Sequence, residues 1–132
     1  MIKWVIEVAQ NVSFNSSVIV ATEDKKIKDL VDSLGVNCFL TKKFHKNGTE
    51  RILEILDHID SELIINLQGD EPLVNPIDLN NLYKAIKSSN IDVASICHEV
   101  DNLEAEEPSN VKVVFDINPV SYTHLTLPTI SW

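Results

Sequence analysis

The segment Gln68-Gly69-Asp70-Glu71-Pro72 is the strongest candidate for chemistry in this sequence. It follows an apolar run over residues 63–67 that predicts a strand, and open α/β sheets bind ligands beyond the carboxyl ends of their strands. Gly69 lets the backbone turn and approach a ligand closely. The carboxylate of Asp70 could hold a hard cation, which takes one or two carboxylates together with phosphate oxygens and water. A simple strand-ending turn, in which Asp70 bonds nearby amides, explains these residues equally well.

A second candidate is the segment Asn47-Gly48-Thr49-Glu50-Arg51. Asn47 and Glu50 have the spacing of a capping box, which predicts that a helix begins here. The free amides of a helix N-terminus can face an anionic ligand, and Arg51 could add a charge-assisted hydrogen bond. A capped helix needs the same residue types for structural reasons alone, so this motif by itself favours the structural interpretation.

The histidines and cysteines give no signal of a metal site. The four histidines lack the spacing of metal ligands, and the two cysteines, Cys38 and Cys97, lie far apart in apolar runs without a CxxC pattern. Two buried free thiols in a reducing cytoplasm are the simplest interpretation. The search for a cation site therefore stays with Asp70.

Helix and strand patterns alternate along the chain, which indicates a mostly parallel α/β sheet flanked by helices. Apolar spacing predicts helices at residues 2–9, 27–34, 48–59 and 76–86, and strands at 18–21, 36–40, 63–67, 92–97 and 111–115. Thr22 is expected to cap the second helix, with Glu23 and Asp24 in its first turn, and Gly35 to end it. Asn75 is expected to cap the last helix, with Pro76 at its first position.

The composition is that of one globular domain with an acidic surface. The chain has 132 residues, of which 44% are hydrophobic, and a formal net charge of −9. A surface this acidic repels a phosphate backbone, so general nucleic-acid binding is not expected. No apolar run approaches the roughly 18 residues that a membrane-spanning helix needs. A small anionic ligand is still compatible with this charge, because local donors and a metal can hold it.

Taken together and in order, these segments resemble the 3-deoxy-manno-octulosonate (Kdo) cytidylyltransferase family, a relative of the sialic-acid cytidylyltransferases. The matching stretches are MIKWV at 1–5, VIVATED at 18–24, HKNGTER at 45–51, NLQGDEP at 66–72 and PSNVKVV at 108–114. The QGDEP element after an apolar strand is the most specific of them. The resemblance covers residues 1–118, and its ordered motifs make the functional interpretation much stronger than any single motif does.

The resemblance implies a Rossmann-like nucleotide-diphospho-sugar transferase fold and a reaction. The anomeric hydroxyl of Kdo attacks the α-phosphate of CTP, which releases pyrophosphate and gives CMP-Kdo for lipopolysaccharide biosynthesis in the cytoplasm. It further implies that Asp70 is a ligand of Mg²⁺, that Gln68 lies against the sugar, and that Asn47, Gly48, Thr49 and Arg51 lie by the nucleotide. Members of the family are usually homodimers.

The sequence departs from the family pattern in several places. Asn47 stands where serine is commoner. The family's first strand, its Arg- and Lys-containing triphosphate loop and its second metal-binding aspartate are not found here. Without that strand, the apolar strands at 18–21 and 63–67 are expected to pair with each other or to expose their edges. The chain is therefore expected to be a partial domain that is inactive by itself.

The last residues differ in composition from the rest. From Ser121 to Trp132 there is no Lys, Arg, Asp or Glu, and the pattern fits neither a helix nor a strand. Residues 119–132 are interpreted as a tail of non-native sequence that follows a partial cytidylyltransferase domain at 1–118. Two alternatives stay open for the function: another sugar cytidylyltransferase, of the 8-amino-Kdo or sialic-acid type, or an α/β remnant without catalysis.

Overall fold

The computed structural model describes residues 1–89, 91–99, 101, 106–108 and 113. The chain divides into two units, residues 1–94 and 95–132, and the helices and strands named below all lie in the first. The strand predicted at 111–115, apart from Val113, and the tail predicted at 119–132 lie outside the described residues.

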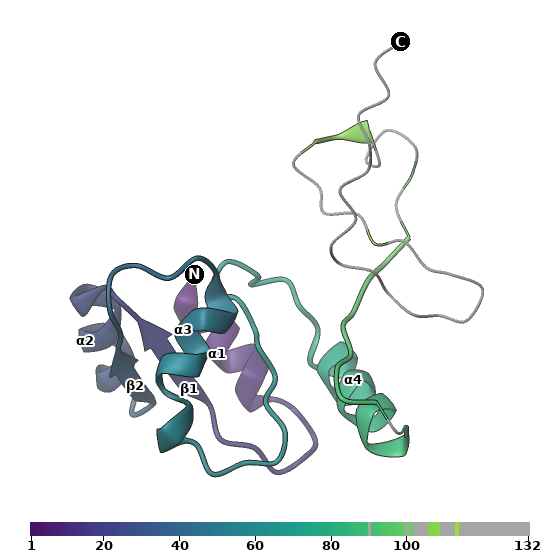
Figure 1. Ribbon diagram of the computed structural model, residues 1–132, viewed down its shortest axis with the longest axis horizontal. Helices are drawn as coiled ribbons and strands as arrows, with labels where there is room; N and C mark the ends of the chain where they lie inside the picture. The colour runs from purple at the N-terminus through teal and green to yellow at the C-terminus, as the bar shows by residue number, and fades with distance from the viewer. Residues whose placement is uncertain (90, 100, 102–105, 109–112, 114–132) are drawn as a thin grey trace. The chain divides into compact units, whose positions relative to one another are not determined.

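Helices and strands alternate over residues 2–54, as the sequence patterns predict, and two further helical segments follow without a strand between them (Figure 1). In chain order they are α1 (Ile2–Gln10), β1 (Ile19–Thr22), α2 (Lys25–Ser33), β2 (Asn37–Leu40), α3 (Gly48–Glu54), the 3₁₀ helix η1 (Leu56–His58) and α4 (Pro76–Ser88). Each predicted helix is present, although the one expected at 48–59 is interrupted. It ends at Glu54, and a separate 3₁₀ turn follows.

β1 and β2 form a parallel two-stranded sheet, which confirms the predicted α/β class. Ile19 pairs with Asn37 at one end of the ladder and Thr22 with Leu40 at the other. The Thr41 amide donates a 2.8 Å hydrogen bond to the carbonyl of Thr22, which carries the pairing one residue further. The carboxyl ends of the two strands therefore lie side by side.

Helices cover both faces of this small sheet. On one face, Ile6 of α1 and the fully buried Val31 of α2 form the core, and Val20 and Cys38 pack against it from paired positions on the two strands. On the other face, Phe39 stacks on a side chain of η1, with ring centroids 5.0 Å apart. Neighbouring residues of a strand point to opposite faces, so each strand contributes to both layers.

The cap of α2 corrects one prediction. Asp24, and not Thr22, is the N-cap residue, because its carboxylate accepts a 2.7 Å hydrogen bond from the Lys26 amide. Thr22 is still part of β1, where its hydroxyl oxygen accepts from the Asp24 amide at 3.2 Å. The helix thus begins two residues later than a Thr22 cap requires. Its end is as predicted, since Gly35 follows it with a φ of 71°, in the left-handed region that glycine tolerates.

The clearest predicted strand, at residues 63–67, is not a strand in the structure. Its side chains alternate as in a strand, with Leu63, Ile65 and Leu67 half-buried and the residues between them exposed. Among the described residues, however, the amides of 64–67 make no backbone hydrogen bond. Strand formation needs a neighbour to pair with, and none lies alongside. The prediction of a strand at 92–97 is wrong in the same way, since these residues are described without a ladder.

Candidate functional site

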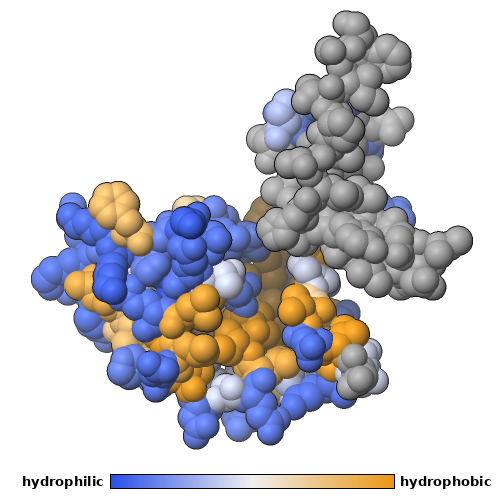
Figure 2. Space-filling model, in the orientation of Figure 1, coloured by the Kyte–Doolittle hydropathy of each residue, from blue (hydrophilic) through white to orange (hydrophobic). Residues whose placement is uncertain are grey.

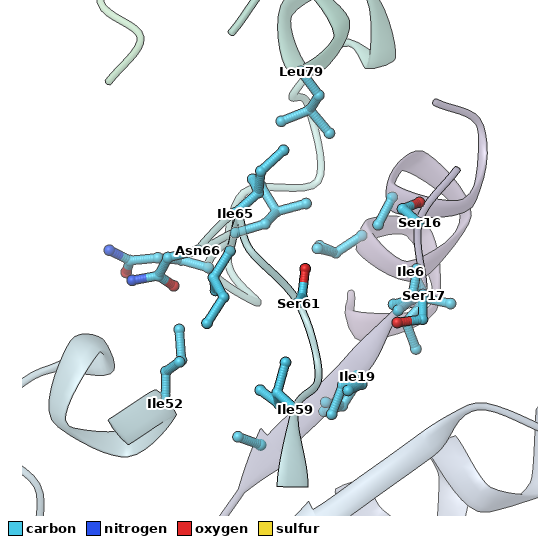
Figure 3. A pocket seen from close by; sticks show the side chains of 18 of the residues that line it. Ile6, Ser16, Ser17, Ile19, Ile52, Ile59, Ser61, Ile65, Asn66 and Leu79 are labelled. Carbon is cyan, nitrogen blue, oxygen red and sulfur yellow. The ribbon is translucent and has the colours of Figure 1, made fainter. Parts of the chain in front are cut away.

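A cavity of about 610 Å³ lies between β1 and the segment 61–70. Apolar side chains from several elements surround it, and Figure 3 shows Ile6, Ile19, Ile52, Ile59, Ile65 and Leu79 arranged around this space. Figure 2 shows apolar side chains open to this face of the molecule. The cavity has the size of a small-molecule site. Its lining includes residues of both motifs singled out in the sequence, together with polar side chains from other segments, such as Ser16, Ser17 and Ser61.

The two motifs meet at this cavity. A Cβ atom placed on Gly48 would lie 3.9 Å from the side-chain nitrogen of Asn66, so the first turn of α3 lies beside the end of the segment 63–67. Gly48, Arg51, Gln68 and Asp70 all line the cavity. The two motifs are more than sixteen residues apart in the sequence, and their spacing does not indicate this contact. The contact depends on how the chain turns through η1.

The Asp70 carboxylate is free to bind a ligand. Asp70 is exposed, lies in a turn and lines the cavity. The turn is closed by a 3.3 Å hydrogen bond from the Glu71 amide to the Gln68 carbonyl, in which the Asp70 side chain takes no part. Within the described part of the chain, its carboxylate has no hydrogen bond or ion pair. The observed turn therefore does not use Asp70 in the way that the purely structural interpretation requires.

The surroundings of Asp70 suit a cation shared with a ligand better than an all-protein site. No group of three His, Cys, Asp or Glu side chains that could hold a metal is present among the described residues. Mg²⁺ typically keeps several waters and takes one or two carboxylates together with substrate phosphates. A single exposed carboxylate at the mouth of a cavity fits that requirement.

The first turn of α3 is held by its own capping interactions. The Asn47 side-chain oxygen accepts a 2.9 Å hydrogen bond from the Glu50 amide, and the Glu50 carboxylate accepts a 2.8 Å bond from the Lys46 amide. The capping box predicted from the sequence is therefore present in a shifted form, in which Glu50 reaches one residue further back. Asn47 and Thr49 are exposed and do not line the cavity, unlike Gly48 and Arg51.

The Arg51 side chain points to the ends of both strands. Its guanidinium donates a 2.7 Å hydrogen bond to the Glu23 carboxylate, just after β1, and a 2.6 Å bond to the hydroxyl of Thr41, just after β2. A longer contact of 3.5 Å reaches the Lys42 carbonyl. The sequence marked Arg51 but neither Glu23 nor Thr41, because partners so far apart along the chain leave no local pattern.

A second side-chain contact, between His45 and Glu54, holds the loop before α3. The His45 Nε2 atom lies 2.8 Å from the Glu54 carboxylate, and the His45 side chain is only 11% exposed. The Nε2 atom makes no hydrogen bond within the described part of the chain, and the contact is an ion pair only when His45 is protonated. The same carboxylate accepts from the Lys42 amide at 3.2 Å. Sequence reasoning gave neither residue a role, since a histidine and a glutamate nine residues apart match no metal or catalytic spacing.

No helix in the part of the chain that the structure describes is long and apolar enough to cross a bilayer.

Comparison with known proteins places these features in a family. The family described as Cytidylyltransferase matches residues 1–125. The 3-deoxy-manno-octulosonate cytidylyltransferase of Escherichia coli is 37% identical over 115 residues, which are 86% of this chain and 47% of the relative. The enzyme of the same name from Francisella tularensis subsp. novicida is 39% identical over 126 residues, covering 89% of this chain and 49% of its own.

The fold has a close match among solved structures. The structure of CMP:2-keto-3-deoxy-manno-octonic acid synthetase complexed with CTP superposes with a TM-score of 0.84 at 35% identity, and the match covers 91% of this chain and 50% of that one. The present chain thus spans about half the length of the curated relatives that it matches.

Proposed function

The chain belongs to the cytidylyltransferase family, and on this premise we propose that the protein transfers CMP from CTP to Kdo, giving CMP-Kdo and pyrophosphate. The free carboxylate of Asp70 at the mouth of the cavity carries the proposal, because the reaction needs a group there that can hold a cation against a triphosphate. The names of the relatives and the CTP in the similar solved structure support the choice of nucleotide and sugar.

The predicted site residues other than Arg51 have the following roles in this proposal. Asp70 provides one carboxylate ligand for Mg²⁺, which when bound neutralises phosphate charge as it develops. Gln68 lies at the same mouth, where its amide can hydrogen-bond the sugar hydroxyls and orient the anomeric oxygen toward the α-phosphate. The turn of Asn47, Gly48 and Thr49 presents backbone amides on the nucleotide side.

The biological setting follows from the product. CMP-Kdo is the activated form of a sugar that a glycosyltransferase adds to lipopolysaccharide, so we place the enzyme in the cytoplasm, where CTP is available. We also propose that the active form is a homodimer, as the family resemblance implies.

The test of this function is a chimaera in which residues 1–118 replace the matching region of the E. coli relative. We expect it to form CMP-Kdo from CTP and Kdo in a Mg²⁺-dependent manner. Asp70→Asn should lower kcat/KM at least about 100-fold, because a metal ligand stabilises the transition state by several kcal/mol. The matched control is Asp60→Asn, a change at an exposed aspartate that does not line the cavity.

Three outcomes would contradict the proposal or a part of it. Near-normal activity of the Asp70→Asn chimaera would remove the role assigned to that carboxylate. Product analysis in the presence of Kdo, 8-amino-Kdo and a sialic acid identifies the sugar that the enzyme uses. A preference for 8-amino-Kdo or the sialic acid would show that the proposed sugar substrate is wrong. Absence of Mg²⁺-dependent CTP binding by calorimetry would leave a remnant without catalysis.

A further inference from the structure

We infer that Arg51 is a positioning residue, which fixes the first turn of α3 to the ends of β1 and β2, and does not itself bind the nucleotide. The inference rests on the proposed function, in which that turn lies on the nucleotide side of the cavity. It changes the role of Arg51 from that of a ligand to that of a link between three elements.

Both terminal nitrogens of the Arg51 guanidinium already have partners. One terminal nitrogen of its guanidinium donates to the Glu23 carboxylate at 2.7 Å, and the other to the Thr41 hydroxyl at 2.6 Å. The side chain is 22% exposed, and Thr41 is 7% exposed as a whole residue. A phosphate that bound both terminal nitrogens of Arg51 at once would have to displace both partners, and Glu23 would then lose its counter-charge. Charge-assisted bonds of this kind are among the stronger hydrogen bonds in proteins.

The charge of Arg51 is also balanced. The Glu23 carboxylate touches the guanidinium, so the pair as a whole presents little net positive charge to the cavity. A triphosphate would be attracted much less strongly to such a pair than to a free guanidinium. Asp70, by contrast, has no ion-pair partner among the described residues, so a cation held there would add positive charge that the paired Arg51 does not supply.

The helix α3 benefits from such a link, because it is short and its own residues are only partly buried. It is seven residues long, from Gly48 to Glu54, and none of its residues is buried. A helix this short is marginal by itself, since nucleation is costly and few hydrogen bonds follow. Arg51 lies at the end of its first turn and ties it to both strand ends, while the contact of Glu54 with His45 holds its last turn.

What the link fixes is the position of the candidate site. The first turn of α3 begins at Gly48, which lies beside Asn66 at the end of the segment leading to Asp70. The Arg51 bonds therefore set the distance between the nucleotide side and the metal side of the cavity. Small displacements of such groups cost a large part of the rate, even when every contacting group is still present.

The first experiment measures backbone hydrogen exchange of the 132-residue chain and needs no activity. We expect Arg51→Gln and Glu23→Gln each to raise exchange of the α3 amides roughly tenfold, the size expected for loss of a charge-assisted bond. Because both changes break the same link, the double variant should exchange no faster than the faster single variant. Lys25→Gln, which breaks an exposed pair within α2, is the matched control and should leave α3 unchanged.

The second experiment separates a positioning residue from a ligand by kinetics of the chimaera. A positioning role predicts that Glu23→Gln and Arg51→Gln lower kcat/KM by similar factors, and that Arg51→Lys, which keeps the pair with Glu23, recovers part of the loss. A ligand role predicts a raised KM for CTP in Arg51→Gln, and an unchanged or lower KM in Glu23→Gln, where the guanidinium is set free.

The outcomes distinguish the link from the proposed function. Unchanged α3 exchange in Glu23→Gln, or single effects that add up in the double variant, would overturn the inference. If the chimaera makes no CMP-Kdo but α3 exchange responds as expected, the link stands and the proposed function fails. If the Arg51→Gln variant does not fold, both experiments can be done with Glu23→Gln. The Glu23 side chain is exposed, and glutamine has nearly the same shape as glutamate.

Discussion

The two cysteine side chains differ in their exposure to solvent. Cys38 is half-buried in the sheet, whereas Cys97 is exposed. Burial raises the pKa of the Cys38 thiol, and this effect outweighs the nearby Lys28 ammonium, which lowers it. Because only the thiolate is nucleophilic, a raised pKa means a smaller reactive fraction at any pH below it. The expectation of two buried thiols is wrong for Cys97, which is exposed, and Cys38 is only half-buried.

We therefore expect Cys38 to react more slowly than Cys97 with iodoacetamide near pH 8. Both its raised pKa and its limited access act in the same direction. Mass spectrometry of peptides after timed alkylation measures the two rates in one sample. The control is the same reaction in concentrated urea, where the rates should converge. Equal rates in the native chain would show that Cys38 is more open than the structure indicates.

The location of the candidate site at Asp70 could be predicted from the sequence, but the contacts between its residues could not. Gln68-Gly69-Asp70 follows an apolar run, and a strand end is where ligands bind, so local order was enough to select it. The contact of Arg51 with Glu23 joins residues 28 positions apart, and nothing in the spacing selects Glu23 from the other acidic residues. Local chemistry is visible in a sequence, whereas the choice among many possible long-range partners is made by the fold.

At the scale of elements, the signals that act within a few residues were the reliable ones. Apolar periodicity predicted α1, α2 and α4, and Asn75 caps α4 as expected, accepting from the Ile77 amide at 2.9 Å. The segment 63–67 failed because a strand depends on a partner that lies elsewhere in the chain. The cap of α2 was misplaced by two residues, because Thr22 and Asp24 are both good cap types and only the strand register decides between them.

The cap of α2 provides a stability test. Asp24→Ala should lower the free energy of unfolding by about 1 kcal/mol, because the Lys26 amide loses its acceptor. The control is Asp29→Ala, which breaks an exposed pair with Lys25 in the same helix and should cost less than about 0.5 kcal/mol. Urea unfolding of the chain followed by circular dichroism measures both. An equal effect of the two changes would mean that the Asp24 cap is not formed in solution.

For the molecule as a whole, the structure decides between two outcomes that the sequence left open for the strands at 18–21 and 63–67. They do not pair. Among the described residues, β1 pairs only with β2, and its other edge faces the cavity. The segment 63–67 lies across the same cavity without backbone partners. The unit therefore carries two extended segments with backbone groups open to pairing, beside a surface rich in apolar side chains. Leu63 is an exception, because its amide and carbonyl bond to the Ser61 side chain.

The last prediction concerns association of the chain made alone. Open, apolar strand edges pair with other chains, so we expect the purified 132-residue protein to associate increasingly with concentration in sedimentation velocity.

A charge on the open segment should oppose this association, because pairing would bury it. Ile64→Lys, at a side chain 43% exposed in the segment 63–67, is therefore expected to shift the protein toward monomer. Ile77→Lys places the same charge on α4 at a residue 62% exposed, and it should leave association unchanged because α4 has no open backbone edge. If both variants act alike, net charge and not strand pairing controls association, and a protein that stays monomeric at every concentration would show that the edges are covered.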